Sequence, residues 1–139
     1  EDATADAEAR EAAATMPFAI LPSGERIEGM ATGIDPKWLR RLRSGAAAIE
    51  ERLDLHGLAA RAARIAVTRA LLAAHEAGRR CLLIVHGRGA RSAEGPVLKA
   101  ALVEWLSAPA LAPLVMAFAS ARPEHGGTGA TYVLLRRKR

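Results

Sequence analysis

The sequence feature that most constrains the fold is the segment at residues 80–86, with its continuous apolar run from Cys81 to Val85, which lies between two segments suited to helices. The segment before it, residues 58–77, contains no glycine or proline, and Gly78 follows it. Pro96 opens the segment after it, which extends to about Ser107. Such an apolar run is typical of a strand that is covered on both faces. Helices on both sides of this strand indicate right-handed crossovers, so the run predicts an α/β fold with a mainly parallel sheet.

Three further strands and one further helix are predicted around this unit. Residues 52–57 alternate apolar side chains before a glycine, and residues 114–119 and 131–135 are short apolar segments. The last two strands flank a Gly-rich loop at residues 122–129, which allows them to pair antiparallel. A helix is predicted at residues 36–44. The predicted fold class is therefore α/β: a two-layer sandwich of order β-α-β-α-β-β with a mixed four-stranded sheet, plus an N-terminal helix.

Helix ends and helix faces are predicted from residue type and spacing. Asp35 suits the N-cap of the N-terminal helix, Pro36 suits its first position, and Gly45 suits its end. The face of the helix at residues 58–77 that follows helical spacing consists of Leu58, Ala62, Ile65, Ala66, Arg69, Leu72 and Ala73. The corresponding face of the helix after Pro96 consists of Val97, Leu98, Ala101, Leu102 and Trp105.

Charge divides the chain into an acidic arm and a basic domain. Residues 1–35 contain eight acidic residues and two arginines, a net charge of −6, whereas the whole chain carries +5, so residues 36–139 carry +11. We expect residues 1–35 to be disordered or loosely docked, residues 36–47 to form a basic helical lead-in, and residues 48–139 to form the compact domain. A basic domain favours a polyanionic partner, although charge that only aids solubility is the alternative.

The sequence contains no segment that resembles a signal peptide or a membrane span. The longest apolar runs, such as residues 81–85, are far shorter than the ~20 residues that a spanning helix needs. Cys81 is the single cysteine, which excludes a disulfide within this chain and fits a reducing compartment. We therefore expect a cytoplasmic protein that does not bind membranes, and we expect it to be a monomer.

Three short segments carry the candidate chemistry. They read Leu-Asp-Leu-His-Gly at residues 53–57, His-Gly-Arg-Gly at residues 86–89, and Gly-Gly-Thr-Gly-Ala-Thr-Tyr-Val at residues 126–133. The first two lie at the carboxyl ends of neighbouring predicted strands. Ligands bind at this edge in open α/β sheets. The sequence therefore predicts one shared site.

Together, in this order and at this spacing, the three segments resemble those of the Smr (small MutS-related) domain family. The resemblance covers about residues 48–137, and residues 36–47 resemble the basic lead-in of stand-alone members. It implies a fold similar to the C-terminal domain of translation initiation factor three, and endonuclease activity that nicks DNA in some members and cleaves RNA in others. Some relatives fused to a MutS-like ATPase replace the histidine of the first segment. This chain retains it as His56, which favours the catalytic branch.

Asp54, His56 and His86 are the candidate catalytic residues. Asp54 and His56 are two residues apart on a predicted strand and share a face, so Asp54 can orient or deprotonate His56, which then acts as a general base. In the alternative interpretation, Asp54 only caps the next helix. His86 precedes a Gly-Arg-Gly turn, and it is either a second acid/base or phosphate donor, or a strand-end histidine bonded to the backbone.

A second group of residues is predicted to bind phosphate. Arg88 is the best clamp, because a glycine on each side lets the backbone approach a phosphate closely, and a plain surface turn is the alternative. The glycines of the third segment form either a second anion-binding nest or a tight connection between strands. Lys99 either faces solvent or reaches the phosphate. The candidate phosphate-binding residues are Gly57, Gly87, Arg88, Gly89, Lys99, Gly126, Gly127 and Gly129.

Two arginine-rich segments are predicted to follow the nucleic-acid backbone, or alternatively to be solvated surface. They supply Arg40, Arg41 and Arg43 from the N-terminal helix and Arg136 and Arg137 from the C-terminal tail. Trp38, beside the first group, either stacks on a base or packs its helix.

No metal site is assigned from the sequence. Two histidines and a carboxylate can hold a divalent ion such as Mg²⁺ or Mn²⁺, so metal-assisted chemistry stays open. Metal-free chemistry is favoured, since a hydrolytic magnesium site usually offers more carboxylates than one aspartate.

An endonuclease that acts on DNA or RNA is the leading functional prediction. The alternative is a non-catalytic module that binds nucleic acid or the ribosome, which the basic charge of residues 36–139 also supports. An enzyme acting on a small phosphorylated molecule is disfavoured, because the chain lacks both a Walker-type Gly-Lys-Ser/Thr and a Rossmann Gly-x-Gly-x-x-Gly segment.

Overall fold

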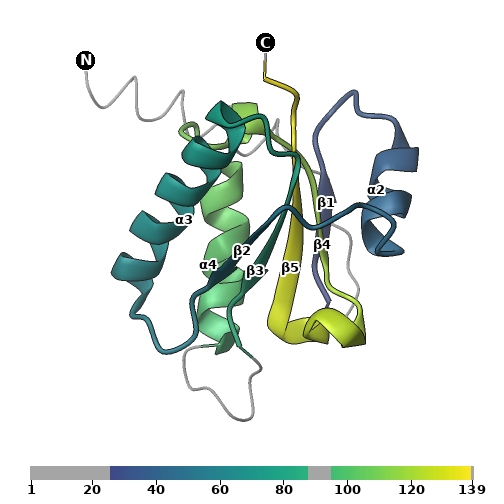
Figure 1. Ribbon diagram of the computed structural model, residues 1–139. Helices are drawn as coiled ribbons and strands as arrows, with labels where there is room; N and C mark the ends of the chain where they lie inside the picture. The colour runs from purple at the N-terminus through teal and green to yellow at the C-terminus, as the bar shows by residue number, and fades with distance from the viewer. Residues whose placement is uncertain (1–25, 88–94, 139) are drawn as a thin grey trace, which may run out of the picture.

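The structure is a computed structural model that describes residues 26–87 and 95–138 (Figure 1). Its strands are β1 (Glu28–Met30), β2 (Glu51–Asp54), β3 (Cys81–Val85), β4 (Val115–Ser120) and β5 (Ala130–Leu135). Its α-helices are α2 (Pro36–Arg43), α3 (Ala60–Glu76) and α4 (Gly95–Ser107). Short 3-10 helices occur at η1 (Ala112–Leu114), η2 (Pro123–His125) and η3 (Gly127–Gly129). From α2 onward, the helices and strands follow the predicted order.

The described strands form one mixed sheet in the order β1-β4-β5-β3-β2. Strands β2 and β3 pair in parallel, and the three other pairings among the described strands are antiparallel. The predicted mixed α/β class is confirmed, but the expectation of a mainly parallel sheet is wrong. The crossover through α4 places β4 parallel to β3 but one strand away. Strand β5 then returns through a short connection and fills the gap, antiparallel to both neighbours.

Strand β1, which the sequence analysis did not predict, brings the described sheet from four strands to five. It pairs with β4, and the Ser120 hydroxyl accepts a hydrogen bond of 2.7 Å from the backbone N–H of Ile27. The guanidinium of Arg26 donates to the Ser120 carbonyl at 2.9 Å. The part of the segment 1–35 that contains β1 is therefore docked on the sheet. Residues 1–25 lie outside the described residues.

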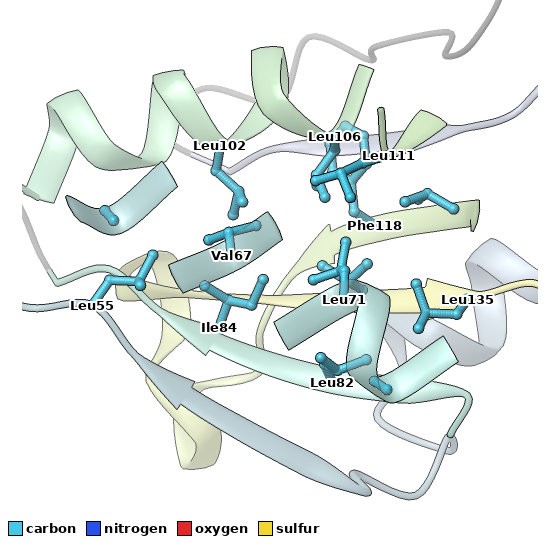
Figure 2. Close-up of a cluster of buried hydrophobic side chains, with 14 of the residues drawn as sticks. Leu55, Val67, Leu71, Leu82, Ile84, Leu102, Leu106, Leu111, Phe118 and Leu135 are labelled. Atoms are coloured by element: carbon cyan, nitrogen blue, oxygen red, sulfur yellow. The ribbon is translucent and has the colours of Figure 1, made fainter. Parts of the chain in front are cut away.

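Helices α3 and α4 cover one face of the sheet, and α2 packs on the other (Figure 1). The larger core lies between the sheet and the α3–α4 layer (Figure 2). Its fully buried members include Leu71 of α3, Leu102 of α4, Ile84 of β3 and Phe118 of β4. A second cluster packs Leu42 of α2 against the opposite face. Both faces of β3 are thus covered, which explains its continuous apolar sequence.

Helix α2 begins where the sequence predicts. The Asp35 carboxylate accepts a hydrogen bond of 2.9 Å from the backbone N–H of Lys37, and Pro36 is the first helical residue. Leu39 and Leu42 form its buried side, so the helix is held by a cap at its start and by two leucines underneath. No helix within residues 26–87 and 95–138 is long and apolar enough to cross a membrane.

The buried face of α3 differs from the predicted one. Its buried side chains are Ala63, Val67, Leu71 and Ala74. By contrast, Ile65 is 46% exposed and Leu72 is 49% exposed. The helix is rich in alanine, so several stripes with helical spacing are comparably apolar. The predicted stripe included Arg69, whose burial would have cost free energy because its charge would lose water.

The buried face of α4 overlaps the predicted one more closely. Leu98 and Leu102 are fully buried, as predicted, but Val97 is exposed and Leu106 completes the buried face. Trp105 packs against the core from its margin and stays partly exposed.

Candidate functional site

The three motif segments meet at one edge of the sheet, the lower edge in Figure 1, which we call the carboxyl edge because β2, β3 and β4 end there. The backbone N–H of Leu55 donates to the carbonyl of Val85 at 2.7 Å, which keeps the chain after β2 beside the end of β3. The carbonyl of Gly129 accepts from the N–H groups of His86 and Gly87, both at 3.0 Å. Backbone hydrogen bonds thus join the three segments.

Asp54 and His56 form a hydrogen-bonded pair at the end of β2. One oxygen of Asp54, Oδ1, bonds both the backbone N–H of His56 at 3.0 Å and its ring Nδ1 at 2.8 Å. Both side chains are open to solvent, at 52% for Asp54 and 71% for His56. Among the described residues, the other ring nitrogen, Nε2, has no hydrogen-bond partner. An ionised carboxylate only accepts, so it places the proton on Nδ1 and leaves the Nε2 lone pair exposed.

The Asp54 carboxylate is held in its ionised form. Burial alone would raise its pKa, but the hydrogen bonds from the backbone and ring of His56, together with the charges of His56 and Arg52, lower the pKa below 3.8. The helix-cap interpretation does not hold. The N-cap residue of α3 is Ala59, and within the described part of the chain no side chain caps this end.

Gly57 shapes the turn that follows the pair. Its φ of +80° lies in the left-handed region that favours glycine, and a Cβ at this position would have nothing within 4 Å. Its function is therefore conformational rather than steric. The turn closes with a 3.0 Å hydrogen bond from the N–H of Leu58 to the carbonyl of Leu55, and α3 begins directly afterwards.

His86 is enclosed, in contrast to His56. Its side chain is fully buried, its Nε2 shares a hydrogen bond of 2.9 Å with the Thr131 hydroxyl, and its Nδ1 lies 3.4 Å from the carbonyl oxygen of Gly87. Burial lowers its pKa from 6.5 to about 4; the charge of Lys99 acts in the same direction, and the Gly87 carbonyl opposes it. A neutral, enclosed imidazole does not reach a phosphate in this arrangement. The geometry favours the interpretation of a strand-end histidine bonded within the fold.

The third segment folds into a tight connection between β4 and β5. The N–H groups of its glycines, Gly126, Gly127 and Gly129, each donate to a backbone carbonyl of the same loop. These hydrogen bonds are 3.0–3.2 Å long. Since the donors are already paired, the geometry favours the tight connection over an anion-binding nest.

Part of the predicted phosphate clamp lies outside the described residues. Arg88 and Gly89 lie outside the described residues. The N–H of Gly87 is paired with the carbonyl of Gly129. Lys99 is half-buried on α4, and it lies close enough to His86 for its charge to lower the pKa of that histidine. Lys99 is therefore near the carboxyl edge, as the phosphate-reaching interpretation requires.

The C-terminal end of α2 lies toward the carboxyl edge. Arg40, Arg41 and Arg43 are exposed in the last turn of the helix. The residue after this turn, Ser44, accepts a hydrogen bond of 3.3 Å on its carbonyl from the guanidinium of Arg122, which follows β4. One of the three charges is partly neutralised, because Arg43 forms an ion pair of 3.3 Å with Glu28.

The arginines of the C-terminal tail lie at the opposite edge of the sheet. Arg136 and Arg137 follow β5, which runs away from the carboxyl edge (Figure 1). A strand of six residues spans about 20 Å. The tail is therefore separated from Asp54 and His56.

Metal donors are sparse at this edge. Among residues 26–87 and 95–138, no three His, Cys, Asp or Glu side chains are grouped so that they could hold a metal ion. At this edge the Asp54 carboxylate is the oxygen ligand that a Mg²⁺ or Mn²⁺ ion could bind together with water and a phosphate oxygen.

Three polar contacts that the sequence did not predict stiffen the carboxyl edge. Thr131 binds His86, and the Tyr132 hydroxyl accepts the backbone N–H of Arg122 at 3.2 Å and bonds the ring of His125. Thr131 and Tyr132 belong to the third motif, so the motif itself was the available signal. Their partners are 7–45 residues away in the chain and are set by strand pairing.

Comparison with known protein families matches the Smr domain to residues 53–136, which is more than half of the chain. The chain belongs to the Smr domain family. The matched segment begins at the strand that carries the Asp54–His56 pair and ends directly after β5.

This Smr domain is also similar to individual proteins. It is 31% identical to YdaL, a stand-alone small MutS-related protein from Escherichia coli, with a TM-score of 0.71 over 85% of this chain and 88% of that chain. It is 35% identical to the Smr domain of Thermus thermophilus MutS2, with a TM-score of 0.54 over 62% of this chain and 98% of that chain. It is 30% identical over 119 residues to the probable DNA endonuclease SmrA of Escherichia coli K12. That alignment covers 85% of this chain but only 62% of the length of SmrA.

Proposed function

We propose that this Smr domain is an endonuclease that hydrolyses phosphodiester bonds in nucleic acid. The observation that carries the proposal is the 2.8 Å hydrogen bond between Asp54 Oδ1 and His56 Nδ1 at an exposed position of the carboxyl edge. A carboxylate that fixes one nitrogen of an imidazole prepares the other nitrogen to take a proton. The relative SmrA is named a probable DNA endonuclease, which supports this activity and favours DNA as the substrate.

In the proposed reaction, His56 Nε2 removes a proton from a water molecule while the water oxygen attacks the phosphorus. The bond between phosphorus and the leaving sugar oxygen breaks, and that oxygen takes a proton from the His56 imidazolium or from solvent. The elements of water are thus divided between the two new ends of the strand. The ionised Asp54 stabilises the imidazolium that forms, so it acts through His56 as a positioning residue.

Helix α3 supplies a favourable electrostatic setting for the phosphate. It begins at Ala60, close behind His56, and its first turn contains Arg61 and no acidic residue. No side-chain cap occupies this end within the described residues. Its first N–H groups and the positive end of its dipole are therefore available to an anion at the carboxyl edge.

His86 has a supporting function in this proposal. Its hydrogen bond with Thr131 ties the end of β3 to the start of β5, directly beside the chain segment that carries His56. Its lowered pKa of about 4 keeps it neutral at the pH of a cleavage assay. We therefore assign proton transfer to His56. His86 instead holds the end of β3 against the start of β5.

The test is cleavage of supercoiled plasmid, linear duplex DNA and single-stranded RNA, each with EDTA, Mg²⁺ or Mn²⁺. The variants are Asp54→Asn and His56→Gln, and the matched control is His75→Gln, which changes a histidine of α3 at the far end of that helix. General acid–base catalysis contributes about 10²–10⁴-fold, so each site variant should lower the cleavage rate at least about 100-fold. The control should cleave like the parent protein.

The affinity for uncleaved nucleic acid is measured on the same preparations by an electrophoretic shift. We expect the site variants to bind like the parent, because they leave the basic surface intact. Equal cleavage by the parent and by His56→Gln would refute the proposed site. If no preparation cleaves any substrate but all shift it, the non-catalytic binding module replaces the nuclease as the function.

A further inference from the structure

Helix α2 carries an indole in a cationic setting. Trp38 is half-buried, and the Lys37 ammonium and the Arg41 guanidinium each lie 5.3 Å from the centre of its ring system. The packing of α2 against the sheet rests on two other side chains, Leu39 and Leu42, which are buried. Trp38 contacts the same apolar cluster only from its margin. Packing of α2 on the sheet therefore buries one part of the Trp38 indole and leaves the other part exposed.

The remaining surface of Trp38 borders a hollow between α2 and the segment that leads to β2. The hollow measures about 360 Å³, and its lining residues are Trp38, Arg41, Ala46, Ala47 and Leu134. This volume lies at the lower end of the ~300–1,000 Å³ that is typical of small-ligand pockets. Two alanines and a leucine give it an apolar lining, the indole gives it a flat wall, and one guanidinium stands at its border.

We propose that this hollow binds an unpaired nucleobase of a single-stranded segment, with the base stacked on Trp38 and its phosphate held by Arg41. Stacking on an aromatic ring beside a cation is the recurring way in which single strands are bound, and it tolerates any base. The exposed Lys37, Arg40 and Arg41 side chains complement the phosphates. The bases of an intact duplex are stacked on each other and cannot enter. The site therefore points to substrates that have an unpaired stretch.

The position of the hollow relative to the carboxyl edge suits one continuous strand. Leu134 lies four residues along β5 from Ala130, which is about 13 Å, and β5 is two strand spacings from β2, which is about 10 Å. A few nucleotides bridge this distance. This relation to cleavage rests on the proposed function, whereas base binding by Trp38 can be tested without any cleavage.

The experiment measures binding in protein that carries Trp105→Phe, so that Trp38 is the remaining tryptophan, and His56→Gln, so that cleavage does not interfere. The probes are a single-stranded DNA 12-mer, an RNA 12-mer of the same sequence and a blunt DNA duplex. Intrinsic fluorescence reports stacking on Trp38, and the anisotropy of labelled probes reports affinity. Trp38→Leu removes the aromatic face but keeps apolar packing, and Trp38→Phe retains both. Leu72→Ala is the surface control.

We expect both single strands to quench the emission of Trp38. Trp38→Leu should weaken single-strand binding about tenfold or more, Trp38→Phe should restore most of it, and Leu72→Ala should leave it unchanged. Duplex affinity should change less than about twofold in all three, since the duplex binds through charge. Arg41→Gln should weaken both kinds of probe and lower their salt dependence.

Unquenched emission on single-strand binding would overturn the proposal, as would equal losses for single strand and duplex in Trp38→Leu. Thermal unfolding of each variant separates lost binding from lost folding, and a Trp38→Phe variant that folds but does not bind would also count against it. These readouts are independent of nuclease activity. A protein that fails to cleave any substrate but still quenches would refute the proposed function and leave the base-binding site in place.

Discussion

Acidification should destabilise this Smr domain through His86, and the size of the effect follows from its surroundings. The imidazole is fully buried, and its Nε2 shares a 2.9 Å hydrogen bond with the Thr131 hydroxyl. Burial, with a contribution from the charge of Lys99, lowers its pKa from 6.5 to about 4. Protonation of His86 in the folded protein would place a positive charge in a buried setting near the charge of Lys99.

The sign follows from comparing the two states of the chain. Between pH 6.5 and about 4, His86 takes up a proton in the unfolded chain but not in the folded one. Acid therefore favours the unfolded chain in this window. The contribution of neutral His86 is fully present above pH 6.5 and is lost as the pH falls to about 4. At pH 5 the loss amounts to about 2 kcal/mol of the free energy of unfolding, relative to pH 8.

The assay is urea unfolding followed by circular dichroism at pH 8, 6.5, 5.5 and 5. The variant His86→Gln keeps a group that can bond Thr131 but does not titrate, so its loss of stability between pH 8 and pH 5 should be about 2 kcal/mol smaller than that of the parent. His75→Gln, in the last turn of α3, should follow the parent. The lowered pKa of Asp54 acts at lower pH, since its contribution is present above 3.8 and fades only below that value.

Parallel loss of stability in the parent and in His86→Gln would refute this reasoning. It would mean that His86 is protonated in the folded protein at pH 5, and hence that the burial and the Thr131 hydrogen bond do not hold it neutral. A smaller loss of stability in His75→Gln than in the parent would show that His75, and not the buried His86, controls the acid response.

Three further predictions concern packing and caps. A Cβ at Gly29 would lie 2.5 Å from the Phe118 ring, so Gly29→Ala should cost about 1–3 kcal/mol of stability in urea unfolding, and an unchanged stability would argue against the docking of β1. Leu71→Ala should cost about 2–5 kcal/mol, whereas Leu72→Ala should stay within about 0.5 kcal/mol, and the reverse ranking would contradict the observed face of α3. Asp35→Ala should cost about 1 kcal/mol by loss of the α2 cap, and thermal unfolding that matches the parent would show that the cap is dispensable.

The sequence predicted the elements whose signals are local. The cap residue Asp35, the helix-opening Pro36 and the apolar run of β3 each act through near neighbours or through overall burial, and each was found where it was expected. The pairing of Asp54 with His56 was also predicted, but the predicted strand is too long, because β2 ends at Asp54 and His56 lies in the turn that follows it.

The features that were not predicted depend on partners far away in the chain. Strand β1 has three residues and no alternation, and it exists because β4 offers it hydrogen bonds about ninety positions later. The enclosure of His86 depends on Thr131, which strand pairing brings beside it. The face of α3 was mistaken because alanine packs almost as well on several sides, so the choice was made by the fit of Val67 and Leu71 to the sheet.

The strand order has a consequence for how the protein is made. Strand β5 is the last described strand along the chain, yet it lies in the middle of the sheet, between β4 and β3. Until residues 130–135 have been synthesised, β1–β4 and β2–β3 are two separate pairs with open edges and no hydrogen-bonded contact. The described domain therefore cannot be assembled piece by piece during translation. The segment that carries Asp54 and His56 is joined through the end of β3 to the third motif only when the ribosome has delivered the central strand.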